Sequence, residues 1–306
     1  MGNTLNNIGF IYKYWGNYQK ACEYFEKTSE ISLQHGFTTS WANAQYHLGN
    51  IYREWHKNNM AYSHLQRALE TFDSLKLIVN KANALNSLGN LYFDQGINEK
   101  AKNFYGEALK IQEKANDLEG IIGSSINLGE VYVSEKKHKN AIFYFDQAFQ
   151  MAKNSNMTYF EAKASLEIGK CYAALNKYSM AVKHLQNACK IAQSGPYYHL
   201  LKPAFQELSE TYENLGNYKQ AYLSLQTHYQ LNDTINKLEN IKAIESLYLK
   251  HNLEANFQKI QELEKNLLAA NKKYRQWKNV SLYLVLTIFS GLFWIFWLFW
   301  KKSKKN

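Results

Sequence analysis

Apolar and small residues recur along this chain at steps of three and four positions, which is the spacing of one face of an α-helix. In residues 84–109 two such runs flank a break at residues 95–98, where Gly96 provides turn chemistry. No stretch shows the sustained alternation typical of a β-strand, and the only two prolines are Pro196 and Pro203. The pattern predicts an all-α protein built from helix–turn–helix units.

The helix–turn–helix unit repeats with a period of forty residues. Six tyrosines mark the period: Tyr12, Tyr52, Tyr92, Tyr132, Tyr172 and Tyr212. An alanine follows each tyrosine by nine residues: Ala21, Ala61, Ala101, Ala141, Ala181 and Ala221. A glycine precedes five of the tyrosines by three residues: Gly9, Gly49, Gly89, Gly129 and Gly169. The sixth unit has Ser209 at that position. A fixed period predicts stacked copies of one unit, with these three sets as packing residues where helices cross closely.

These units resemble the tetratricopeptide repeat over residues 2 to about 232. The first helix carries LGN-x-Y, as at residues 48–52 and 88–92, and the second carries alanine, leucine or an aromatic residue, then alanine. The resemblance implies a right-handed superhelix of six forty-residue repeats. Two features depart from the family: the period exceeds the common thirty-four residues, and Thr28 and His228 replace the last alanine in the outer units.

The resemblance also implies a binding surface, because the first helix of each unit in such a superhelix lines a concave groove. Projecting that face gives the candidate residues Asn43, Asn50, Arg53, Asn83, Asn86, Asn90, Asp94, Asn127 and Lys170. Asparagine can donate to and accept from a peptide backbone, so the expected partner is a protein or peptide. Arg53 and Lys13 do not complete the family's chaperone-type carboxylate clamp, which is therefore not predicted. The alternative is that these polar residues only keep the groove soluble.

The sequence contains no motif typical of catalysis, of a bound cofactor or of a metal site. The nine histidines are scattered, and His64 and His184 occupy equivalent places in their repeats, which favours packing over ligation. Cys22, Cys171 and Cys189 form no CxxC pair and are expected to be buried on repeat helices. We therefore expect a non-enzymatic protein.

The basic charge of the chain is concentrated near its C-terminus. Eight of the ten net positive charges lie in residues 272–306, which contain no acidic residue. Because these lysines and arginines flank an apolar segment, we expect membrane phosphates as their partner and no nucleic acid.

Residues 233–278 are predicted to form a long polar helix in which apolar residues follow a period near 3.5. The seam residues are Leu249, Leu253, Ile260, Leu263, Leu267, Ala270, Tyr274 and Trp277. Asn256 occupies one seam position, where a lone asparagine can set the register of a coiled coil. Two interpretations stay open: a coiled-coil homodimer through residues 249–277, or a single helix folded back on the last repeat.

Residues 279–300 are predicted to form one transmembrane helix, followed by a short basic tail at 301–306. The stretch from Val280 to Trp300 holds 21 residues without a charge. At about 1.5 Å per residue it spans roughly 30 Å, the thickness of a bilayer's hydrocarbon core. Tyr274 and Trp277 precede it, tryptophans crowd its end, and lysines bracket both sides. The lipid bilayer is therefore an expected partner, with a single pass near the C-terminus.

The orientation in the membrane stays open, since four basic residues lie on each side of the span. The repeats begin at residue 2 without a capping segment, so we expect a clipped start. The repeat domain would be periplasmic if an upstream signal has been lost, and cytosolic otherwise.

Repeats, a long helix and one span also resemble the sensor half of bacterial membrane signalling proteins of the Bacteroidetes, and no output domain fits in KKSKKN. This favours a membrane-anchored interaction scaffold or sensor in envelope signalling. The alternatives are the sensory fragment of a histidine kinase or transcriptional regulator, and a cytosolic tail-anchored assembly factor.

Overall fold

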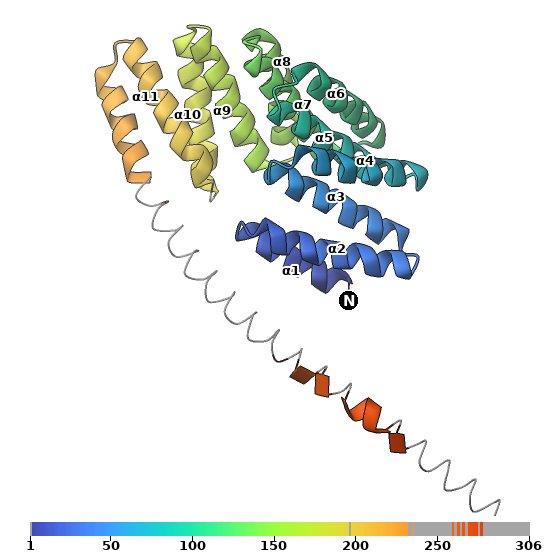
Figure 1. Cartoon of the computed structure of the whole chain (residues 1–306). Coiled ribbons are helices and arrows are strands. Elements are labelled where there is room, and N and C mark those ends of the chain that lie inside the picture. Colours follow the sequence, from blue (N-terminus) through green and yellow to red (C-terminus); the bar gives the residue numbers. More distant parts are fainter. Residues whose placement is uncertain are drawn as a thin grey trace, which may run out of the picture. The chain divides into compact units, whose positions relative to one another are not determined.

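The computed structural model describes residues 2–195 and 197–231, together with scattered residues between 235 and 277. Eleven helices have defined bounds: α1 (Gly2–Tyr14), α2 (Tyr18–Gln34), α3 (Thr38–Glu54), α4 (Asn58–Ser74), α5 (Ile78–Asp94), α6 (Asn98–Ala115), α7 (Leu118–Ser134), α8 (His138–Asn154), α9 (Thr158–Ala174), α10 (Tyr178–Ser194) and α11 (Tyr198–Asn214). Residues 218–231 are helical as well, and the described ranges contain no strand. The predicted all-α repeat architecture is confirmed (Figure 1).

The helices of residues 2–231 stack in chain order, each packing against the next. Odd-numbered helices also contact one another, α1 with α3 and so on to α9 with α11, whereas the even-numbered helices from α2 to α10 do not. Elements on the inner side of a curved stack approach each other, and those on the outer side spread apart. The odd-numbered helices therefore form what we call the inner face of the repeat stack (Figure 1).

The turns between the helices explain the constant period. At each turn inside a repeat a backbone N–H donates to the carbonyl of the repeated tyrosine five residues earlier, as Lys57 does to Tyr52 at 2.8 Å and Ile97 to Tyr92 at 2.9 Å. The residue before this donor has a positive φ, 73° at Gly96 and 56° at His56. This is the Schellman arrangement, in which the short turn after a helix provides hydrogen-bond donors for the last carbonyls of that helix.

The repeated glycines lie where the two helices of a repeat approach most closely. A Cβ added to Gly89 would lie 2.5 Å from the ring of Tyr105, and one added to Gly49 would lie 2.6 Å from Leu65. The repeated alanines from Ala21 to Ala181 have no exposed surface. Because these positions have no room for a larger side chain, the small residues recur in every unit.

The departures from the repeat pattern have local explanations. Ser209, at the glycine position, donates its hydroxyl proton to the carbonyl oxygen of Ala221 over 2.9 Å. Thr28 donates to the carbonyl of Tyr24 in its own helix at 3.1 Å. The imidazole Nδ1 of His228 lies 3.0 Å from the carbonyl oxygen of Lys202. Each polar atom therefore has a partner within the stack, as buried polar groups require.

The chain divides into two units, Met1–Leu238 and Glu239–Asn306, which are described separately. The predicted span at 279–300 and the basic tail at 301–306 lie outside the described residues, as do four of the eight seam residues, Leu249, Leu253, Ile260 and Leu267. Among the residues that are described, no helix is long and apolar enough to cross a membrane.

Candidate ligand-binding surface

The candidate groove residues all lie on odd-numbered helices, and most of them contact protein rather than solvent. The guanidinium of Arg53 on α3 pairs with the carboxylate of Asp94 on α5 at 2.6 Å. Asn86 on α5 exchanges hydrogen bonds of 2.9 and 3.0 Å with the hydroxyl of Ser124 on α7. These pairs join neighbouring repeats, so their first role is to hold the stack together.

Other candidates bond within their own repeat or helix. The side-chain oxygen of Asn90 accepts a hydrogen bond from the hydroxyl of Tyr105 at 2.7 Å. The amide of Asn50 donates to the carbonyl of Tyr46 at 3.0 Å, and the ammonium of Lys170 pairs with Glu167 at 2.8 Å. Asn50 and Asn90, the positions suggested by the resemblance, therefore have their polar groups partly engaged.

Three asparagines among the candidates are more weakly engaged. Asn43 accepts a long hydrogen bond of 3.4 Å from Asn80 on the next odd-numbered helix. Asn83 is exposed and Asn127 half-buried, and neither has a polar partner within the described ranges. The candidate residues are therefore spread along the inner face in separate pairs and do not converge on one site.

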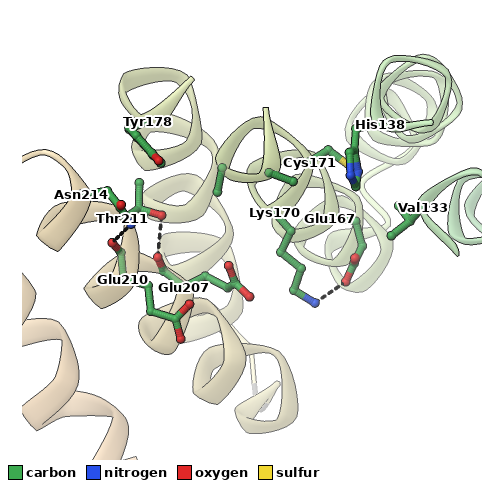
Figure 2. Close-up of a pocket in the computed structure, with 12 residues that line it drawn as sticks. Val133, His138, Glu167, Lys170, Cys171, Tyr178, Glu207, Glu210, Thr211 and Asn214 are labelled. Atoms are coloured by element: carbon green, nitrogen blue, oxygen red, sulfur yellow. Dashed lines mark hydrogen bonds and ion pairs between the residues drawn. The ribbon is translucent and has the colours of Figure 1, made fainter. Parts of the chain in front are cut away.

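A cavity of about 380 Å³ lies at the other end of the inner face, between α9 and α11, with contributions from α7, α8 and α10 (Figure 2). Its lining residues are Val133, His138, Glu167, Lys170, Cys171, Ala173, Ala174, Tyr178, Glu207, Glu210, Thr211 and Asn214. This volume is at the lower end of the range for ligand sites in proteins. Of the sequence-predicted candidates, only Lys170 lines it.

Sequence reasoning missed Glu207 and Glu210, although the forty-residue register contains the signal. Glu207 occupies the position of Asn127 two repeats earlier, and Glu210 occupies the position of Lys170 one repeat earlier. Extending the same projection to the sixth repeat would have found both. The cavity itself depends on how α9 and α11 are spaced, which no periodicity encodes.

The charges in the cavity are unbalanced. Glu167, Glu207 and Glu210 contribute three carboxylates, and Lys170 contributes the one ammonium of the lining. Burial, and then the nearby carboxylate of Glu210, raise the pKa of Glu207, while Lys170 opposes the shift. Among the described residues no cation lies within ion-pair distance of Glu207, and the nearby Lys170 pairs with Glu167 instead.

Hydrogen bonds of the remaining polar groups define the cavity wall. The hydroxyl of Thr211 donates to the backbone carbonyl of Glu207 at 2.6 Å, and the amide of Asn214 to that of Glu210 at 2.8 Å. The Glu210 carboxylate accepts from Gln206 at 3.2 Å. His138 has a buried Nδ1 without a partner in the described structure. The cavity thus keeps polar capacity that the protein itself does not use.

The other reactive residue types occupy packing positions. Burial raises the pKa of the Cys22 thiol to about 11 and those of Cys171 and Cys189 to about 12, and all three side chains are buried. His64 and His184 stack on the repeated tyrosines Tyr52 and Tyr172, and burial lowers the pKa of both. No three His, Cys, Asp or Glu side chains in the described part are placed to hold a metal ion.

Two family models match the repeats of this chain. The tetratricopeptide repeat model matches residues 1–74, 40–114 and 80–154, and a second tetratricopeptide repeat model matches residues 162–194. The chain belongs to the tetratricopeptide repeat family. No curated protein matches the sequence significantly.

Solved structures share the tetratricopeptide fold at low sequence identity. BtubC (BKLC) from P. vanneervenii has a TM-score of 0.65 at 17% identity, over 72% of this chain and 92% of that one. A Rap protein complexed with competence and sporulation factor has a TM-score of 0.55 at 15% identity, over 76% and 75%. PilF from Pseudomonas aeruginosa has a TM-score of 0.56 at 18% identity, over 79% and 96%.

The cations at the start of this tetratricopeptide repeat stack are already paired. Lys13 lies 2.8 Å from Glu54, and Arg53 lies 2.6 Å from Asp94. A cationic clamp for a ligand carboxylate would need these groups free. In this structure both cations are therefore engaged within the stack.

Proposed function

We propose that this tetratricopeptide repeat protein is a membrane-anchored, non-catalytic scaffold or sensor module of envelope signalling that holds a protein or peptide on its inner face. The cavity between α9 and α11 is the observation that carries the proposal, because it combines concave shape with unused polar groups. The Rap structure in complex with competence and sporulation factor supports the idea that a stack of this fold takes up a ligand.

The membrane part of the proposal rests on the sequence. An uncharged stretch of 21 residues from Val280 to Trp300, bracketed by lysines, fits a single-pass anchor in a lipid bilayer. The repeat domain is proposed to be periplasmic, or cytosolic if the chain inserts by its tail alone. The side chains of Leu263, Tyr274 and Trp277 in the predicted seam are exposed, which supports a homodimer through 249–277.

Site-specific photo-cross-linking tests the binding role. Benzoylphenylalanine is placed at Tyr178, which lines the cavity, and at Phe143 on the even-numbered helix α8, whose side chain is 59% exposed. In native membranes we expect a discrete cross-linked protein or peptide from position 178 and none from position 143. Equal labelling at both positions, or none at position 178, would contradict binding on the inner face.

Two alternative functions are distinguished by cheaper observations. The order of repeats, long helix and apolar stretch suggests the sensory fragment of a histidine kinase or transcriptional regulator. If that alternative is right, the DNA beyond codon 306 encodes an output domain in the same reading frame. A cytosolic tail-anchored assembly factor would be digested at its repeats by protease only after the cytoplasmic membrane is opened.

A further inference from the structure

The cavity between α9 and α11 presents carboxylates from two sides. Figure 2 shows the carboxylate of Glu207 on α11 pointing toward the Glu167–Lys170 pair on α9, with Glu210 one turn further along the same helix. Lys170 lies 2.8 Å from Glu167, so its charge is already matched by one carboxylate. No cationic side chain of the described chain lies within ion-pair distance of Glu207 or Glu210, so negative charge is in excess at the cavity.

The remaining lining suits a long side chain with a charge at its tip. Val133, Ala173 and Ala174 provide apolar surface, and the ring of Tyr178 is part of the wall. Such surface packs against the methylene stem of a lysine or arginine, whose charged end can then reach a carboxylate. The buried Nδ1 of His138 is a further unsatisfied polar atom at the cavity. His138 is itself half-buried, and this nitrogen adds one position that can form a hydrogen bond with a ligand.

Other ligand classes fit this lining less well. A phosphate or a ligand carboxylate would meet net negative charge, which costs free energy in a half-buried site. A metal ion would need three ligating side chains placed together, and the described residues contain no such group. An uncharged apolar side chain would leave Glu207 without a partner.

We propose that this cavity recognises a lysine or arginine side chain of the bound protein, and that the carboxylates of Glu207 and Glu210 bind its positive charge. The proposal rests on the proposed function, because it names the chemistry of the ligand held on the inner face. Because Lys170 neutralises Glu167, only Glu207 and Glu210 are left to bind the positive charge of the ligand.

The test uses a positional-scanning nonapeptide library on the purified full-length chain, in which each pool fixes one amino acid at the central position. The lysine and arginine pools are expected to bind about tenfold more strongly than the norleucine pool, as one charge-assisted hydrogen bond would give. Glu207→Gln, which keeps the side-chain shape, is expected to remove most of this preference. Lys170→Met is expected to increase it, because one more carboxylate becomes free.

Glu213→Gln is the matched control, since Glu213 is exposed on the same helix and does not line the cavity. It should leave the preference for lysine and arginine unchanged. Melting curves followed by circular dichroism check that every variant is folded.

The outcomes separate the two proposals. Binding of several pools without preference for lysine or arginine, or a preference that survives Glu207→Gln, overturns the charge recognition and leaves the binding role standing. Absence of binding by every pool overturns the charge recognition as well, and together with an unlabelled position 178 it also removes the proposed function.

Discussion

The inner face has a paired end at α3 and α5 and a cavity end at α9 and α11, and equivalent positions in the repeats play different roles at these two ends. In α3 and α5 the groove positions hold Asn50 and Asn90, and the neighbouring charges Arg53 and Asp94 pair with each other. In α9 and α11 the same register holds Lys170 and Glu210 beside a cavity with surplus carboxylates. Lys170 pairs with Glu167, but no cation of the described residues lies within ion-pair distance of Glu207 in the same cavity. A polar residue on a repeat face therefore does not by itself identify a binding site; a carboxylate without a cationic partner is the stronger signal.

This difference also separates stability from recognition. Residues whose polar groups are satisfied by neighbouring repeats stabilise the stack, so their loss should lower the free energy of unfolding. Unsatisfied groups at the cavity are a cost to the unliganded protein, so their loss should weaken binding without destabilising the fold. The following substitutions test this separation.

The largest effect is expected from Tyr105→Ala in the α5–α6 repeat. Tyr105 is 1% exposed, fills the space over Gly89 and donates to Asn90 at 2.7 Å. Removing it should lower the free energy of unfolding by about 3–5 kcal/mol in urea titrations. The matched change Phe143→Ala, at a side chain 59% exposed, should cost less than about 0.5 kcal/mol. A variant that still folds should keep its preference for lysine and arginine.

Overpacking in the repeat between the two ends should have a smaller effect. Ala141 has no exposed surface, whereas Lys139 on the same helix is exposed. Ala141→Phe is expected to cost about 1–3 kcal/mol in thermal unfolding, and Lys139→Phe to be nearly neutral. Equal shifts of the melting temperature would contradict the placement of Ala141 at the closely packed crossing of the two helices.

Breaking the Arg53–Asp94 ion pair at the paired end should have a modest effect on the free energy of unfolding. The side chains of Arg53 and Asp94 are 21% and 43% exposed, so solvent screens much of their attraction. Arg53→Gln should therefore cost at most about 1 kcal/mol, and less in high salt. Lys114→Gln, at an exposed lysine, serves as the control. If Arg53→Gln lost the binding of the lysine and arginine pools, the paired end would also take part in recognising the ligand.

The smallest effect concerns pH. Burial and the Glu210 carboxylate raise the pKa of Glu207 above its ordinary value of 4.5, so the folded chain holds this proton more tightly than the unfolded chain. The stabilising contribution of this group is complete below pH 4.5 and is lost as pH rises through the raised pKa. Glu207→Gln should therefore melt higher than the parent at pH 7 and gain less at pH 4, while Glu213→Gln should show no such pH dependence. A lower melting temperature at pH 7 would show that Glu207 has a cationic partner.

The sequence was sufficient for the repeat architecture because the architecture depends on local geometry. Gly89 and Ala101 are fixed by the crossing of two helices in one repeat, and the forty-residue period by one kind of turn. The partners of the groove residues were not predictable in the same way. Asn86 and Ser124 are 38 residues apart, and only the spacing of α5 and α7 brings them together.

The cavity was missed for the same reason. Glu207 and Glu210 appear in the sequence as ordinary surface glutamates of an amphipathic helix. The partial burial of Glu207 and the lack of a cationic partner for both glutamates arise from the approach of α11 to α9 and from the pairing of Lys170 with Glu167. Such properties depend on contacts between repeats, which a single sequence does not specify.

The most direct test of the difference between the two ends is photo-cross-linking from two exposed asparagines on the inner face. Asn83 lies on α5 at the paired end, and Asn214 lies on α11 at the cavity. With benzoylphenylalanine at each position in native membranes, we predict that a ligand is captured from position 214 and not from position 83. Capture from position 83 alone would contradict the account, because the ligand would then bind at the end where Arg53 pairs with Asp94 and Asn90 bonds to Tyr105.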